Sequence, residues 1–147
     1  MRTLVIYLRL TLITAIFLTQ PVLSQNLNAK SLNSDKDGQA ILIKGSGTYH
    51  RQISTDQSIA QNFFDQGLRY AWGFYFPESI ASYQRAAMSD PTHPMIYWGL
   101  AHAMGPNPNS RYSGMPDDPK SEGLRAIKKA LKLIQNASVI EQDMIKA

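Results

Sequence analysis

The stretch SIASYQRAAMSDP, residues 79–91, decides the fold of this chain. Pro77, just before it, suits the first turn of a helix, because the N–H that proline lacks would be unpaired there. Apolar side chains at helical spacing form one face, at Phe76, Ile80, Tyr83 and Ala87. Asp90 precedes Pro91 and ends the helix, because the residue before a proline is pushed out of the helical region. The sequence therefore predicts an amphipathic helix with a defined start and a defined end.

A second apolar stripe lies before this helix. Ser54 and, three residues later, Gln57 match a capping box, so we expect the first helix to start in the Ser54–Gln57 stretch. Its stripe consists of Phe63, Phe64, Gly67, Leu68, Tyr70, Ala71 and Phe74.

Two more helices are predicted after residue 91. The third covers Met95–Met104 and is ended by the glycine- and proline-rich stretch that follows it. Asp118-Pro119 opens the fourth, and we expect Asp118 to cap this helix rather than to hold a cation. The apolar face of the fourth helix consists of Leu124, Ile127, Leu131 and Ile134.

A fifth helix is predicted to begin at Ser138, because Glu141 follows it at the spacing of a capping box. Ala147 lies within this helix, and no cap or stop signal precedes it. We therefore expect the sequence to be a fragment of a longer protein, or the product of a gene that was cut short.

Residues 60–93 resemble one unit of the tetratricopeptide (TPR) repeat, which is about 34 residues long. The positions that match its pattern are Phe63, Gly67, Tyr70, Ser79, Tyr83, Ala86 and Pro91. Small residues in this pattern let two helices approach closely, and the aromatic residues fill the space beside them. Gln66 and Phe74 depart from it, since leucine and glycine are usual there. The resemblance implies an all-α fold, in which antiparallel helix pairs form a TPR-type α-solenoid.

Residues 94–136 resemble a partial second unit, which an insertion at 105–118 interrupts. The matching positions are Tyr97, Leu100 and Ala101. A Trp-Gly-Leu-Ala helix followed by Gly-Pro-Asn is similar to a group of poorly characterised exported bacterial TPR proteins. The repeat region is thus expected at 54–147, with the start of a further helix at 138–147.

Residues 1–24 have the features of a secretory signal peptide, and a polar linker with a possible extended arm follows at 25–53. The apolar part of the leader is shorter than the about 20 residues of a membrane-spanning helix. An uncleaved anchor and a buried hydrophobic helix are the alternatives. The net charge falls from +4 to +2 without Arg2 and Arg9, which is too weak a field to suggest nucleic-acid binding.

The first helix of each TPR pair lines a concave groove, and the resemblance implies candidate partner-binding residues there: Phe64, Leu68, Trp72, Trp98 and His102. TPR domains that bind a terminal carboxylate have Lys and Asn at positions that are apolar or aromatic here. The groove is therefore expected to suit an apolar or extended peptide. The alternatives are that these side chains belong to the core, or that the arm before Ser54 covers them.

The insertion contributes Arg111 and Tyr112 as candidate contact residues, although it could equally be a spacer. His93 and His102 lack the spacing of a helical metal pair, and His50 lies alone in a segment expected to be extended. No nucleophile motif, paired carboxylates or phosphate-binding loop is present. The sequence predicts no catalytic residue, cofactor or metal.

Together these features lead us to expect an exported scaffold that binds an unidentified protein or peptide through the aromatic groove or the 105–118 insertion. Contact with a membrane is expected only during export, and the protein is expected to be periplasmic or extracellular afterwards. The alternative is the N-terminal part of a larger enzyme or metal-binding protein whose site lies mostly beyond residue 147, with His102 contributing. A third possibility is that the segment only caps a solenoid.

Overall fold

A computed structural model describes residues 39–105 and 114–147 of the chain. In this part the protein consists of five α-helices and one 3-10 helix, with no strand, so the predicted all-α class is confirmed. The leader at 1–24 and the candidate residues Arg111 and Tyr112 lie outside the described residues.

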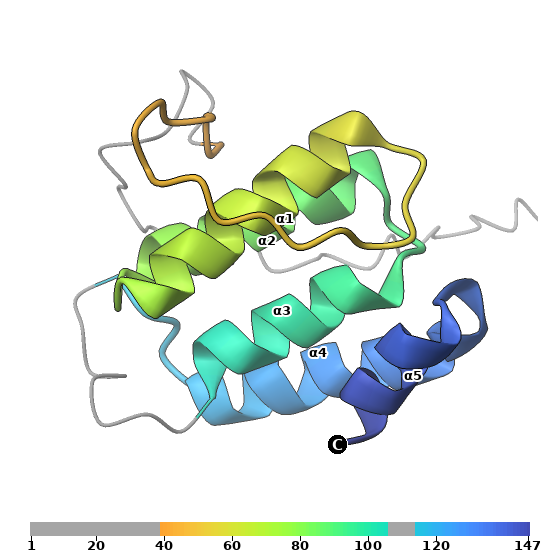
Figure 1. The fold of residues 1–147 in the computed structure, drawn as a ribbon. Helices are drawn as coiled ribbons and strands as arrows, with labels where there is room; N and C mark the ends of the chain where they lie inside the picture. Colours follow the sequence, from red (N-terminus) through yellow and green to blue (C-terminus); the bar gives the residue numbers. More distant parts are fainter. Residues whose placement is uncertain (1–38, 106–113) are drawn as a thin grey trace, which may run out of the picture.

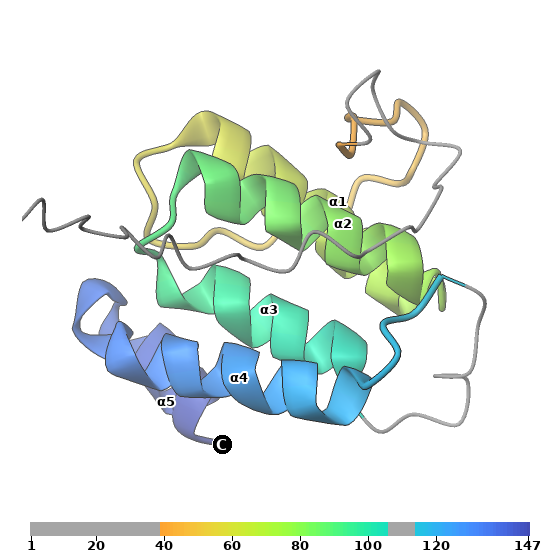
Figure 2. The same cartoon turned by 180° about the vertical axis from the view of Figure 1, so that it is seen from behind.

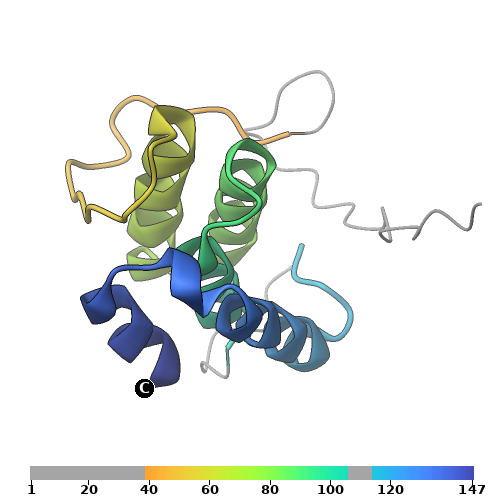
Figure 3. The same cartoon turned by 90° about the vertical axis from the view of Figure 1, so that its right-hand side faces the viewer.

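The helices form two antiparallel pairs, followed by a short fifth helix (Figure 1). Their bounds are α1 Ser58–Trp72, α2 Phe76–Ser89, α3 Pro94–Met104, α4 Pro119–Lys132, η1 Ile134–Asn136 and α5 Val139–Lys146. Viewed from behind, α2 and α4 face the reader, so the segment before α1 lies on the side of α1 and α3 (Figure 2). Figure 3 shows this segment and α5 on one side of the molecule.

Most predicted helix boundaries are confirmed by local geometry. Pro77 lies in the first turn of α2, and Asp90 is its C-cap. The carboxylate of Asp118 accepts a hydrogen bond from Ser121 N at 3.1 Å, which caps α4. Ser138 and Glu141 form the expected capping box of α5.

The predicted capping box of α1 is wrong. The helix begins at Ser58, and its N-cap Gln57 makes no capping bond with its side chain. The hydroxyl of Ser54 instead donates to Glu141, 87 residues away. The Ser54 side chain, which the local pattern assigned to the start of α1, therefore makes a tertiary contact with α5 instead.

Tyr83 lies at the centre of the packing between α1, α2 and α3. A Cβ atom built on Gly67 would lie 2.8 Å from its ring, and one built on Gly99 would lie 2.4 Å from it. Its ring therefore fills a space that exists because both neighbouring helices carry glycine. Ser79 Oγ donates to the Gly67 carbonyl at 2.8 Å across the same contact.

The apolar face predicted for α4 is only partly buried. Leu124 and Leu131 are exposed, whereas Gly123 and Ala130 are buried. A Cβ on Gly123 would lie 3.3 Å from the Cβ of Met104, so the backbones of α3 and α4 approach closely there. Close approach selects the small residues of α4 as its contact line, which rotates the leucines outward.

Candidate functional site

Residues 39–57 form an extended arm that runs along α1 before the chain enters the helix (Figure 1). Only two apolar side chains of the arm are buried, those of Ala40 and Ile53. Ile41, Leu42 and Tyr49 remain exposed. Most hydrogen bonds between the arm and α1 involve the backbone of the arm.

Two glutamines of α1 bind this backbone in the same way. Gln66 donates from Nε2 to the carbonyl of Ile41 at 2.8 Å and accepts from the N–H of Ile43 at 2.8 Å. Gln61 donates to the carbonyl of Arg51 at 2.9 Å and accepts from the N–H of Ile53 at 2.9 Å. In an extended chain these two groups of residues i and i+2 point to the same side, so one primary amide can satisfy both.

Charged residues of α1 add two further anchors. Asp65 accepts from the N–H of Arg51 at 3.0 Å, and its other oxygen lies 2.6 Å from Nδ1 of His50. Arg69 donates to the carbonyl of Tyr49 at 2.9 Å and to Ser46 Oγ at 3.2 Å. The hydrogen bond with Asp65, and then its negative charge, raise the pKa of His50 above the ordinary value.

Two of the candidate partner-binding residues, Phe64 and Leu68, lie on α1. Phe64 is fully buried and packs edge-on against Tyr83, with 5.6 Å between ring centroids. Leu68 is also buried. Both side chains are inside the folded chain, as the core alternative expected, and neither is presented to a partner.

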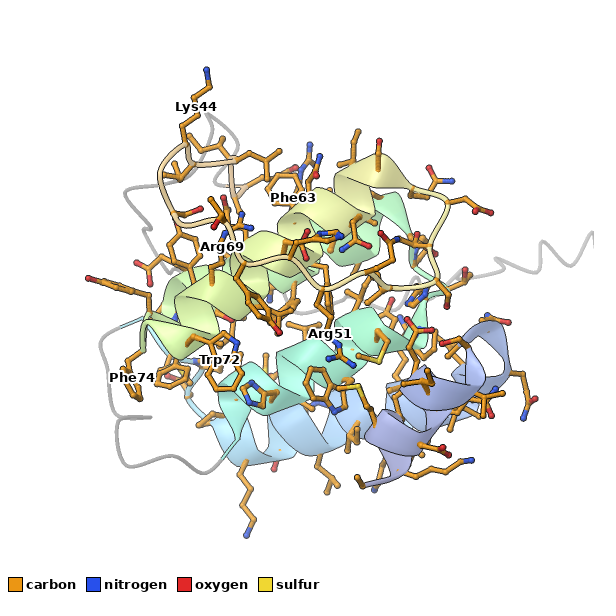
Figure 4. The ribbon with its side chains drawn as sticks, in the orientation of Figure 1. Lys44, Arg51, Phe63, Arg69, Trp72 and Phe74 are labelled. Carbon is orange, nitrogen blue, oxygen red and sulfur yellow. The ribbon has the colours of Figure 1, made fainter. Side chains whose placement is uncertain are left out.

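The other three candidates lie together on the surface, and we call Trp72, Trp98 and His102 the aromatic surface. The imidazole of His102 stacks on Trp98, with centroids 5.4 Å apart and an interplanar angle of 20°. Its centroid lies 6.1 Å from that of Trp72. Trp72 is 64 % exposed at the end of α1, and Trp98 is half-buried on α3. Figure 4 shows Trp72 on the same side of the molecule as Arg51 of the arm.

Partial burial changes the acid–base behaviour of His102. Removal of its ring from water lowers its pKa below the ordinary value, so the neutral form is favoured. A neutral imidazole beside two indoles makes this surface largely apolar near neutral pH.

Ser54, His93 and Glu141 form a polar cluster where the arm, the α2–α3 turn and α5 meet. His93 Nδ1 accepts from the N–H of Met95 at 3.3 Å, so Nε2 carries the proton of the neutral ring and faces Ser54 Oγ at 3.1 Å. Glu141 accepts from the N–H of Ser54 at 2.8 Å. Burial raises the pKa of Glu141, but the hydrogen bonds from Ser138 and Ser54 outweigh this effect and hold the pKa below its ordinary value.

Serine, histidine and a carboxylate, the residue types of a Ser-His-Asp/Glu catalytic triad, are present in this cluster, but their contacts differ from those of a triad. A catalytic serine needs an unprotonated Nε2 and a carboxylate at Nδ1. Here Nδ1 caps α3, and the carboxylate of Glu141 lies 3.9 Å from Nε2. The geometry holds three segments together rather than activating Ser54, although a shallow polar pocket of about 410 Å³ adjoins Ser54 and His93.

The residues that bind the arm are not identified by the sequence analysis. Asp65 and Gln66 lie within the apolar stripe of α1, and both are buried. A polar residue at an inward position needs a partner, and this is the signal that could have identified them. Their partners lie 14 to 25 residues earlier in the chain, so local patterns could not name them.

In the described ranges, no three potential metal-ligating side chains gather into one group. Nor do these ranges contain a helix with the length and hydropathy needed to cross a membrane. No protein-family model, curated protein or solved structure matches the chain.

Proposed function

We propose that this chain is a TPR-type scaffold that binds a partner protein through the aromatic surface. The observation that carries this proposal is the cluster of Trp72, Trp98 and His102 on the side of the molecule formed by α1 and α3. Large aromatic side chains supply much of the binding energy of protein interfaces at a small cost in conformational entropy.

Helix packing supports the TPR part of the proposal. Tyr83 packs against Gly67, and both residues are among the positions that match the repeat pattern. Successive helices pack against their neighbours along the chain, which is how a solenoid grows. Nζ of Lys129 on α4 lies 4.1 Å from the ring centroid of Tyr97 on α3, and this cation–π contact stabilises the packing of α3 against α4.

The test is capture of partners from an envelope extract by the tagged, full chain. Trp72→Ala and Trp98→Ala are compared with Ile140→Ala, which removes an equally exposed apolar side chain from α5. We expect a protein that is captured by the parent and by Ile140→Ala to be lost with both tryptophan variants. Equal capture by all four proteins would exclude the aromatic surface as the binding site.

We also propose that the chain is exported, on the basis of the leader at residues 1–24. N-terminal sequencing of the protein recovered from cell fractions tests this proposal. We expect a start near Gln25 in material outside the cytoplasm. Recovery of the uncleaved chain in the cytoplasm alone would contradict it.

A further inference from the structure

The contacts of the arm divide into those that depend on its sequence and those that do not. Gln61, Asp65, Gln66 and Arg69 together bind six backbone N–H or C=O groups of the arm. These groups belong to five residues: Ile41, Ile43, Tyr49, Arg51 and Ile53. These groups are present in any extended polypeptide except at proline. Hydrogen bonds to main-chain groups provide affinity without selecting the side chains of the bound segment.

The apolar side chains of the arm contribute little to its attachment, whereas polar ones such as His50, Ser46 and Ser54 do form hydrogen bonds. Ala40 and Ile53 are buried, but Ile41, Leu42 and Tyr49 are exposed by 39 %, 47 % and 48 %. The apolar burial that would make the arm a permanent part of the core is therefore limited to its two ends. A segment with little apolar burial between its ends opens more readily than a packed helix.

Gln66 makes the surface beneath the arm suited to a polypeptide, because its amide pairs with a backbone C=O and a backbone N–H. Its side chain is 1 % exposed, and it also donates to Ser82 Oγ at 3.1 Å. When the arm leaves, Nε2 and Oε1 of Gln66 each lose a backbone partner. An incoming extended chain that supplies a C=O and an N–H two residues apart restores both hydrogen bonds.

From this geometry we propose that the α1 surface formed by Gln61, Asp65, Gln66 and Arg69 is a binding site for an extended peptide segment, and that the arm occupies it as a displaceable intramolecular ligand. The proposal rests on the scaffold function above and specifies its partner. The partner contributes an extended, proline-free segment with a small or aliphatic side chain at each end, matching Ala40 and Ile53. The aromatic surface lies on the same side of the molecule and provides a second contact.

The test uses a fluorescent peptide with the sequence of residues 39–53 as a probe for the full chain. Ile43→Pro weakens the chain's own arm, because proline removes the N–H that Gln66 accepts. The apparent affinity for the probe is reduced when the arm occupies most of the sites. Because the variant leaves more sites free, we expect it to bind the probe roughly tenfold more tightly than the parent does. Adding Gln66→Leu should abolish the gain, whereas adding Gln84→Leu, on α2, should leave it unchanged.

Two variants of the probe test how the segment is recognised. A probe with proline at position 43 should lose binding, because its N–H is missing. A probe with serine at positions 41 and 42 should bind as well as the parent probe, because those side chains are exposed in the docked arm. Binding that is unaffected by Gln66→Leu, or that depends on positions 41 and 42, would overturn recognition through the backbone.

Hydrogen exchange of the unmodified chain tests whether the arm can be displaced. The amides of Ile43, Arg51 and Ile53 should exchange faster than those in the middle of α1. Exchange as slow as that of α1, together with no probe binding to Ile43→Pro, would make the arm a permanent part of the fold. In that case partner capture that still depends on Trp98 would leave the scaffold proposal standing, so the two failures can be distinguished.

Discussion

At the scale of single residues, Phe74 shows why the TPR pattern has glycine at its position. Its φ of 64° lies in the left-handed region, which glycine enters without penalty. The ring of Phe74 lies 6.2 Å from that of Phe76, and this contact compensates part of the cost. The departure from the pattern is thus a local strain accepted at the α1–α2 turn.

We predict that Phe74→Gly is more stable than Phe74→Ala by about 1 kcal/mol. Both variants lose the ring contact, so the difference depends on the Cβ atom. The left-handed backbone conformation costs alanine about 1–2 kcal/mol. Glycine lowers the stability by about 0.4–1 kcal/mol, because its unfolded state has more conformational entropy, and this smaller cost leaves the glycine variant more stable. Urea unfolding measures this difference. An alanine variant as stable as the glycine variant would show that the turn relaxes to another conformation.

Gly99 carries a second residue-scale prediction. Alanine favours a helix over glycine by about 1 kcal/mol, but its Cβ would lie 2.4 Å from the Tyr83 ring, and such overpacking costs about 1–3 kcal/mol. Since Gly67 confines the ring on its other side, we expect Gly99→Ala to lower the free energy of unfolding by about 1–2 kcal/mol. Thermal and urea unfolding check this value. Gly123→Ala, whose nearest contact is the longer 3.3 Å to the Cβ of Met104, is the comparison and should be less destabilising than Gly99→Ala.

At the scale of elements, the attachment of the arm to α1 depends on pH through His50. Its pKa is raised, so the pairing with Asp65 stabilises the docked arm fully below the ordinary value of 6.5. This contribution is lost as the pH rises through the higher pKa of the folded state. Hydrogen exchange at Arg51 N, corrected for intrinsic rate, should therefore show more frequent opening at alkaline pH. His50→Gln should remove this dependence, and a variant that keeps it would assign it to another group.

Helix ends and helix faces differed in how far the sequence could predict them. The end of α2 at Asp90, the cap at Asp118 and the capping box at Ser138 follow from neighbouring residues, and all three are present. The face of α4 and the start of α1 depend on partners distant in sequence. Gly123 of α4 packs closely against Met104, so Leu124 faces solvent. The hydroxyl of Ser54 donates to Glu141 instead of capping α1.

The candidate site follows the same division. Trp72, Trp98 and His102 lie together on the surface, and helical spacing places Trp98 and His102 on one face of α3. Phe64 and Leu68 came from the same pattern but are buried. The pattern gives a position on a helix, whereas burial depends on what else covers that position.

At the scale of the whole molecule, Glu141 connects α5 with the arm and with the α2–α3 turn. Glu141→Ala removes the charged acceptor of Ser54 N and Ser138 N, and a hydrogen bond to a charged group contributes about 1.5–3 kcal/mol to stability. We predict a loss of about 2 kcal/mol in the free energy of unfolding near neutral pH.

The pH dependence of this loss identifies its origin. The pKa of Glu141 is lowered, so its contribution is present above the ordinary value of 4.5 and disappears as the pH falls through the lower pKa of the folded state. The parent and the alanine variant should therefore converge in stability in acid. A difference that is constant across this range would mean that packing, rather than the carboxylate charge, holds the three segments together.

The bond between Ser54 and Glu141 also sets an order of events during synthesis. Glu141 is translated 87 residues after Ser54, which at about 5–20 residues per second is a delay of about 4–17 seconds. For most of that interval, once residue 72 has been added, the ribosome has produced α1 and its glutamines but not Glu141, the last anchor of the arm. The nascent chain thus passes through a stage in which its N-terminal segment is incompletely fastened and remains available to the factors that meet it first.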